Sequence, residues 1–286
     1  MLTILFDGVA YGMLLFLLAC GLAVTLGLMN FVNLAHGVFA MGGGYVTALL
    51  MNRAGIPFLA TLPFAFVVPA LVGVVVERLL YRRLYGASPL DQVLLTIGLV
   101  LMAIPAFDYF LTDQPQQIHL PPFLQGRFEL PGLTIGAYRL FLVVVCGIIA
   151  ATLQVFLVGT RFGAQLRAAV DDRRVAAGLG IDVGRLFAVA FAIGSGLAGL
   201  GGALAADVVG GVDPNFPVKF LVSFLIVVAI GGSRGIAGAF FGALLLGVLD
   251  VAGKYYVPSI GAFVIYAVMV ATLLIRPQGL FAKSGT

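Results

Sequence analysis

The stretch that decides the fold is residues 8–52, GVAYGMLLFLLACGLAVTLGLMNFVNLAHGVFAMGGGYVTALLMN. It contains no Asp, Glu, Lys or Arg over 45 residues. A helix needs about 20 apolar residues to cross about 30 Å of hydrocarbon. The stretch is therefore long enough for two membrane spans, joined by a polar junction between Asn30 and His36.

The rest of the chain repeats this pattern. Of its 286 residues, 62% are hydrophobic and only 10% charged, whereas soluble domains carry about 25% charged residues. This composition excludes ordinary soluble enzymes, disordered chains and nucleic-acid-binding proteins. We expect one all-α membrane domain over residues 1–286, with helices at about 5–28, 35–51, 57–80, 91–111, 139–158, 186–206, 217–232, 236–253 and 260–276.

The expected architecture is a polytopic bundle of 8–9 transmembrane helices. The uncertainty in the number comes from residues 35–51, where Gly42, Gly43 and Gly44 could break the helix or make it re-entrant. If it spans, the N-terminus lies outside, and if it is re-entrant, the N-terminus lies inside. An external loop is expected at about 112–138.

The basic residues predict the orientation of the chain, because cytoplasmic loops are enriched in Lys and Arg. When the loop after the third helix is placed inside, most of the 16 basic residues fall on the cytoplasmic side. These are Arg78, Arg82, Arg83, Arg161, Arg167, Arg173, Arg174, Arg185, Arg234, Arg276 and Lys283. Five fall outside: Arg53, Arg127, Arg139, Lys219 and Lys254. The C-terminus is therefore predicted to be cytoplasmic.

We find no pattern typical of catalysis, metal binding or cofactor binding. The two cysteines and two histidines have no metal-ligand spacing. Gly253-Lys254 lacks the rest of a phosphate loop, and Gly194-Ser195-Gly196 has no later histidine to act as a base. An ATP-driven process would therefore need ATP hydrolysis by another subunit. No carboxylate lies in the middle of a span, which argues against an ion-coupled carrier.

The junction between the first two spans is the most unusual local string. Asn30, Asn33 and His36 stand between two apolar runs. Asn33 could cap the second helix by accepting from its free backbone N–H groups, which is the interpretation we favour. Alternatively, the three residues belong to a gate or a translocation path.

Residues 160–184 look like a structured cytoplasmic loop. They carry seven charges and ordered apolar positions, and connections between helices usually span only about 2–8 residues. We expect two short helices, the second capped by Asp171 or Asp172 and ended by Gly180. Such a loop could lie on membrane lipid, cover the bundle, or fit a groove in a cytoplasmic partner, and its mixed charge favours the groove. The candidate docking residues are Arg167, Asp171, Asp172, Arg173, Ala176, Ala177 and Gly180.

Four strings, spread in order over residues 21–280, resemble the branched-chain amino acid permease family of ABC importers, and in particular its LivH-type subunit. They are Gly21-Leu22-Ala23 through Asn33-Leu34-Ala35-His36-Gly37, Leu166-Arg167-Ala168-Ala169 through Leu179-Gly180-Ile181, Ile230-Gly231-Gly232-Ser233-Arg234-Gly235 through Gly238 and Gly242, and Arg276-Pro277-Gln278-Gly279-Leu280. In that family the second string would be the ATPase-contacting coupling-helix loop.

The resemblance implies a bacterial inner-membrane permease subunit that moves leucine, isoleucine or valine by alternating access. It further implies a second permease subunit, either a paralogue or the same chain, two cytoplasmic ABC ATPases that use the ATP, and an external solute-binding protein. The alternatives are a permease for another small solute, such as a sugar, a short-chain amide or another amino acid, and an ion-coupled secondary carrier.

Overall fold

The computed structural model describes residues 1–286 except 30, 112–113, 131–132, 233–235, 277 and 281–286. Its long helices are α1 (Leu2–Met29), α2 (His36–Ala54), α3 (Phe58–Leu79), α4 (Pro89–Phe110), α5 (Ala137–Gly159), α8 (Val183–Val208), α9 (Phe216–Gly231), α10 (Ile236–Tyr256) and α11 (Gly261–Ile275). The short elements are η1 (Tyr81–Leu84), η2 (Pro122–Leu124), β1 (Arg127–Leu130), β2 (Leu133–Gly136), α6 (Arg161–Asp171) and α7 (Arg173–Gly178). A long helix thus occupies each range expected from the sequence.

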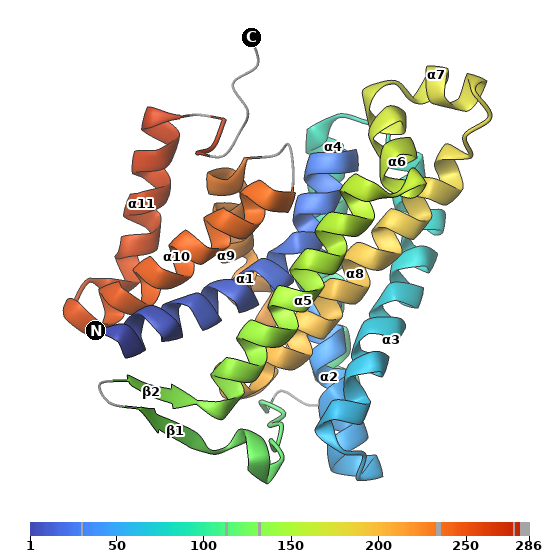
Figure 1. The fold of residues 1–286 in the computed structure, drawn as a ribbon. Coiled ribbons are helices and arrows are strands. Elements are labelled where there is room, and N and C mark those ends of the chain that lie inside the picture. The colour runs from blue at the N-terminus through green and yellow to red at the C-terminus, as the bar shows by residue number, and fades with distance from the viewer. Residues whose placement is uncertain (30, 112–113, 131–132, 233–235, 277, 281–286) are drawn as a thin grey trace.

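The helices pass back and forth between two ends of the molecule (Figure 1). The helices α6 and α7 lie at the same end as the last turn of α11, and the hairpin β1–β2 lies at the opposite end. The start of α1 is tied to the hairpin end, because the Thr134 backbone N–H donates to Thr3 Oγ1 at 3.3 Å and Arg139 pairs with Asp7. The N-terminus therefore lies at the end opposite to α6 and α7.

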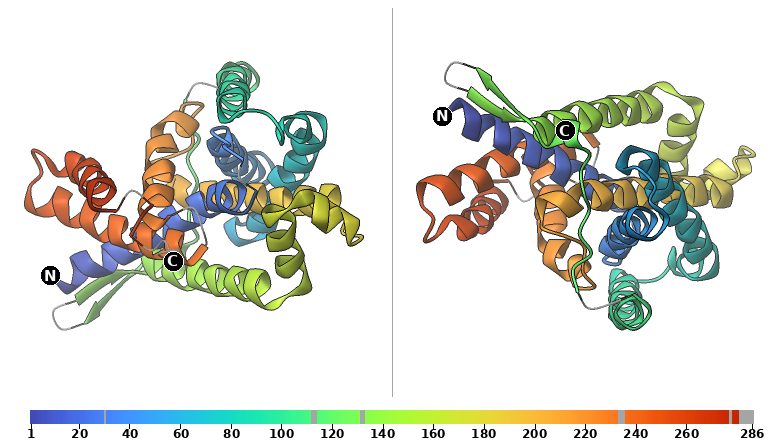
Figure 2. Two further views of the ribbon diagram at one scale, coloured as in Figure 1. Left: turned by 90° about the horizontal axis from the view of Figure 1, so that it is seen from above. Right: turned by 90° about the horizontal axis from the view of Figure 1, so that it is seen from below.

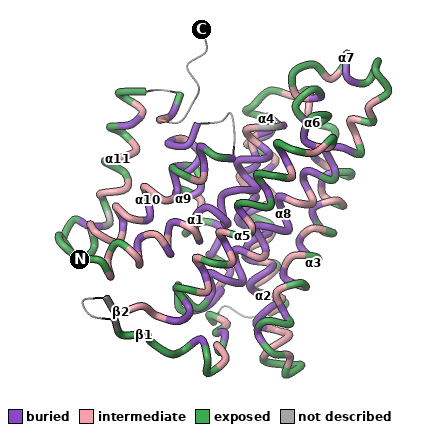
Figure 3. Tube along the Cα trace, in the orientation of Figure 1, coloured by how far each residue is buried: buried purple, intermediate pink, exposed green. Residues whose placement is uncertain are grey.

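The core of the bundle is formed by α1 and α8, which are the most buried of the apolar helices (Figure 3). The helix α8 packs against α1, α2 and α3, and α1 packs against α10. Small residues make this packing close: a methyl group at Gly202 of α8 would overlap the Ala40 carbonyl of α2. Because lipid gives helices no hydrophobic incentive to associate, such close backbone contact holds them together.

In the part of the chain that the structure describes, six helices are long and apolar enough to cross a membrane, namely α1, α3, α4, α5, α8 and α10. The helices α9 and α11 are apolar but shorter, and α2 is less apolar because it contains His36, Asn52 and Arg53. The interruption considered at Gly42–Gly44 is absent, since α2 is a continuous 19-residue helix. Gly43 and Gly44 serve close packing instead, since a methyl group at Gly43 would overlap the Gly199 backbone of α8 and one at Gly44 would overlap the Val212 side chain.

The helix α4 stands at the edge of the bundle (Figure 2). Only 11% of its most apolar 18-residue stretch is buried. Its closest backbone packing is with η1. A capping box starts it: the Asp91 N–H donates to Ser88 Oγ, and the Ser88 N–H donates to the Asp91 carboxylate. Such reciprocal caps satisfy two free donors at a helix start.

The region expected as a plain loop, 112–138, contains a two-stranded antiparallel hairpin in which Arg127 pairs with Gly136 and Phe128 with Ile135. The all-α expectation misses this element. The signal was present in the sequence, because Arg127-Phe128-Glu129-Leu130 and Leu133-Thr134-Ile135 alternate polar and apolar residues as short strands do.

Candidate functional site

The two short helices α6 and α7 form a compact element between α5 and α8. Thr160 Oγ1 caps α6 by accepting from the Gly163 N–H. Asp172 caps α7, because its carboxylate accepts from the Arg174 and Val175 N–H groups at 2.8 and 3.0 Å. Gly180, at φ +82°, lies in the turn that follows. The structure thus assigns the cap expected at Asp171 or Asp172 to Asp172.

Two faces of α7 differ in exposure. Ala176 is buried against its own chain, whereas Val175 and Leu179 are 58% and 76% exposed. The exposed pair is spaced four residues apart, so both side chains lie on one side of the element. This apolar pair can contact a second molecule, and Ala176 cannot.

Arg173 points inward from the start of α7. Its guanidinium carbon lies 4.7 Å from the centre of the Tyr85 ring and 4.6 Å from that of Phe187. These distances are typical of cation–π contacts. The Tyr85 hydroxyl donates to Glu77 Oε1 at 2.8 Å. Burial, followed by this hydrogen bond, raises the pKa of Tyr85, and burial lowers the pKa of Arg173.

Asn33 belongs to the same region. Its side-chain oxygen accepts from the Tyr81 hydroxyl at 3.2 Å, and α2 begins at His36 after Ala35 with no side-chain cap. The expectation that Asn33 caps α2 is therefore wrong. The reason is that its oxygen is used by a tyrosine from the α3–α4 connection, while its amide nitrogen is buried without a partner in the described part of the chain.

His36 lies on the other side of the junction. Its Nε2 is 2.8 Å from the Leu18 carbonyl of α1, and its ring contacts Phe224 of α9 at 5.8 Å. It is buried and joins α2 to α1 and α9. Asn30, the third residue named for the junction, lies outside the described residues.

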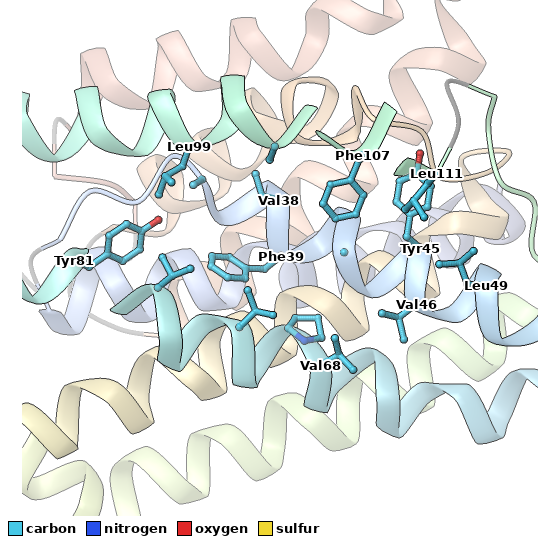
Figure 4. A pocket seen from close by; sticks show the side chains of 16 residues that line it. Val38, Phe39, Tyr45, Val46, Leu49, Val68, Tyr81, Leu99, Phe107 and Leu111 are labelled. Carbon is cyan, nitrogen blue, oxygen red and sulfur yellow. The ribbon is translucent and has the colours of Figure 1, made fainter. Parts of the chain in front are cut away.

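A cavity of about 280 Å³ lies between α2, α3 and α4. Figure 4 shows Phe39 of α2 between Leu99 of α4 and Val68 of α3. The lining of the cavity is apolar except for the phenol groups of Tyr45 and Tyr81. Asn33 and His36 are not among the lining residues, but Tyr81 joins Asn33 to the wall. Such a cavity suits an aliphatic group.

Comparison with known proteins shows the family. Residues 4–273 match the family described as the branched-chain amino acid transport system permease component. The chain belongs to this branched-chain amino acid permease family. It is 26% identical to the high-affinity permease protein BraD of Pseudomonas aeruginosa, over 98% of this chain and 95% of BraD.

Two LivH proteins are also similar to this permease. The high-affinity permease protein LivH of Escherichia coli is 27% identical over 98% of this chain and 94% of its own. The probable LivH of Methanocaldococcus jannaschii is 30% identical over 97% of this chain and 91% of its own. No solved structure matches the chain.

The structure divides the seven candidate docking residues of the permease into two groups. Asp171, Asp172, Ala177 and Gly180 are exposed. The other three are engaged within the chain: Arg167 donates to the Leu157 carbonyl, Arg173 lies between two rings, and Ala176 is buried.

Sequence reasoning missed the exposed pair Val175 and Leu179 and the ring cluster around Arg173. The exposed pair could have been found from the sequence, because Val175 and Leu179 are spaced four residues apart. No local pattern could show the second, because Tyr85 and Phe187 come from distant parts of the chain. Parts of two strings that carry the family resemblance, residues 233–235 and Pro277, lie outside the described residues.

Proposed function

We propose that this chain is a permease subunit of an ATP-driven importer that moves leucine, isoleucine or valine across a bacterial inner membrane. The observation that carries the proposal is the family match over residues 4–273, together with relatives named as branched-chain amino acid permeases over nearly their whole length. The nine long helices would give eight or nine spans.

The orientation follows from charge. The end that carries α6, α7 and the last turn of α11 is the cytoplasmic one, because nine of the 16 basic residues lie there within the described part of the chain and cytoplasmic loops are enriched in Lys and Arg. The hairpin end then faces the external solute-binding protein.

An ABC ATPase docks on the exposed side of the α6–α7 element. Val175 and Leu179 supply apolar contacts, and Asp171 and Arg174, both exposed, supply charged ones at the rim. Interfaces of this kind have an apolar centre and a polar edge. Two ATPases and a second permease subunit, either a paralogue or the same chain, complete the complex.

The cavity between α2, α3 and α4 receives the aliphatic side chain of the solute during passage. Its volume of about 280 Å³ and its apolar lining suit a branched hydrocarbon group, while the charged ends of the solute need groups outside it. ATP drives the change between outward and inward access only if it binds one conformation more tightly than the other.

Affinity isolation of the tagged chain from membranes, with its partners identified by mass, tests this proposal. We expect an ABC ATPase, a second permease chain and a binding protein whose released ligand is leucine, isoleucine or valine. A binding protein loaded with a sugar or an amide would contradict the solute assignment. Accumulation by the purified chain alone, driven by a proton or sodium gradient, would contradict the whole proposal.

A further inference from the structure

Besides the buried Ala176, the docking helix α7 reaches the membrane core through the side chain of Arg173. Arg173 is the first residue of α7, and its guanidinium lies within 5 Å of the ring centres of Tyr85, from the α3–α4 connection, and Phe187, from α8. These two rings also contact each other edge-on at 5.3 Å. A displacement of α7 therefore acts directly on Tyr85.

Tyr85 in turn contacts two further elements. Its hydroxyl donates to the fully buried Glu77 at the end of α3. Its ring contacts the edge of Phe31 at 5.7 Å, and Phe31 belongs to the segment between α1 and α2. Arg173 is thus two contacts away from that segment.

Tyr81 links Phe31 to the cavity. Its ring lies 4.8 Å from Phe31 and 5.1 Å from Phe191 of α8, and its hydroxyl donates to Asn33. Tyr81 also lines the cavity between α2, α3 and α4. A second link holds the same segment, because the Val32 N–H donates to Gln92 Oε1 at 3.0 Å and the Gln92 amide donates to the Leu84 carbonyl at 3.2 Å.

We propose that Arg173, Tyr85 and Tyr81 are positioning residues that transmit movement of the docking helix α7 to the α1–α2 segment and to the wall of the cavity. The inference rests on the proposed function, because its test by uptake assumes that the chain is a permease. It changes the role expected for Arg173, which holds its own helix to the core and does not contact the ATPase.

Close packing makes this connection mechanically stiff. The rings of Phe31 and Tyr81 are buried and that of Tyr85 is partly buried, and packed interiors transmit displacement because they contain few voids. Aromatic pairs favour particular geometries, so a shifted Tyr85 moves Phe31 with it.

The test compares Arg173→Met, which keeps length but removes the cation, with Arg53→Met as the matched control, since Arg53 is an exposed arginine in the last turn of α2, outside the docking element. Both are measured in the complete complex. For Arg173→Met we expect ATPase association unchanged, uptake reduced about tenfold, and more ATP hydrolysed per solute, from the loss of a partly buried cation–π contact. Arg173→Lys should recover part of the uptake, and Arg53→Met should resemble the wild type.

Two results would overturn the proposal. Loss of ATPase association in Arg173→Met would make Arg173 a docking contact, and wild-type uptake per ATP would show that the connection transmits nothing. A double-mutant cycle on thermal unfolding of the complex, with Arg173→Met and Tyr85→Leu, tests the contact without any transport assay. We expect the melting temperature of the double variant to shift by less than the sum of the shifts of the two single variants. Additive shifts would refute the contact between Arg173 and Tyr85. This result does not depend on which solute is transported.

Discussion

The phenolic oxygen of Tyr81 lies 3.2 Å from the side-chain oxygen of Asn33, although the two residues are 48 positions apart. Both are almost completely buried. This hydrogen bond joins the α3–α4 connection to the segment that enters α2, and it explains why a residue that looks like a helix cap takes no part in capping.

Removing the Tyr81 hydroxyl leaves the Asn33 oxygen buried without its donor. An unsatisfied buried polar group costs about 1–3 kcal/mol, so Tyr81→Phe should lower the melting temperature of the purified chain. Tyr109→Phe is the matched control, because Tyr109 is 85% exposed and should unfold like the wild type. Equal melting temperatures for both variants would show that the hydrogen bond contributes nothing.

The exposed apolar pair formed by Val175 of α7 and Leu179, which directly follows α7, predicts a docking defect without a folding defect. Leu179→Asp places a charge where an apolar contact is expected, and we expect binding of the ATPase to weaken about tenfold or more, which is about 1.4 kcal/mol. Co-purification of the ATPase measures this. Phe128→Asp is the control, because Phe128 is 54% exposed and lies in β1 at the opposite end of the molecule. An ATPase yield equal in both variants would count against the docking face.

The cavity predicts a dependence of uptake on its free volume. Ala103 of α4 lines the cavity, so Ala103→Phe should fill part of it and reduce leucine uptake, while ATPase association stays unchanged. We expect alanine, with its smaller side chain, to be affected less. Leu101→Phe is the control, because Leu101 lies on the same helix and is 65% exposed. Undiminished leucine uptake in Ala103→Phe would show that the cavity is not part of the translocation path.

The glycines of α8 predict a stability difference between two identical substitutions. Gly202→Ala places a methyl group against the Ala40 backbone, and overpacking costs about 1–3 kcal/mol, so the melting temperature should fall. Gly147→Ala, in α5, meets nothing within 4 Å and should be neutral or slightly stabilising, since glycine costs about 0.5–1 kcal/mol inside a helix relative to alanine. The opposite order would contradict the packing of α2 on α8.

The helices were predictable because charge-free runs mark the spans, and most bounds agree within a few residues. The start of α8 was placed three residues late, at 186, because the charged Arg185 suggested a boundary. In the structure, Asp182 caps the helix by accepting from the Arg185 N–H at 3.0 Å, so the helix begins before the charge.

The candidate site was predictable only in its local parts. The two short helices and the cap at Asp172 follow from a local pattern of apolar, acidic and glycine residues. The inward turn of Arg173, the Tyr81–Asn33 hydrogen bond and the cavity depend on which helices become neighbours. Those neighbours are set by close backbone packing, which leaves no periodic signal at the residues concerned.

Leucine uptake into proteoliposomes tests the central claim most directly. The chain is reconstituted with its permease partner and ATPases, the loaded binding protein is added on the outside, and ATP is sealed inside. The account predicts accumulation that requires ATP, the ATPases and the binding protein together, and none by the chain alone. Accumulation without the ATPases, or no transport of leucine, isoleucine or valine by the complete complex, would contradict it.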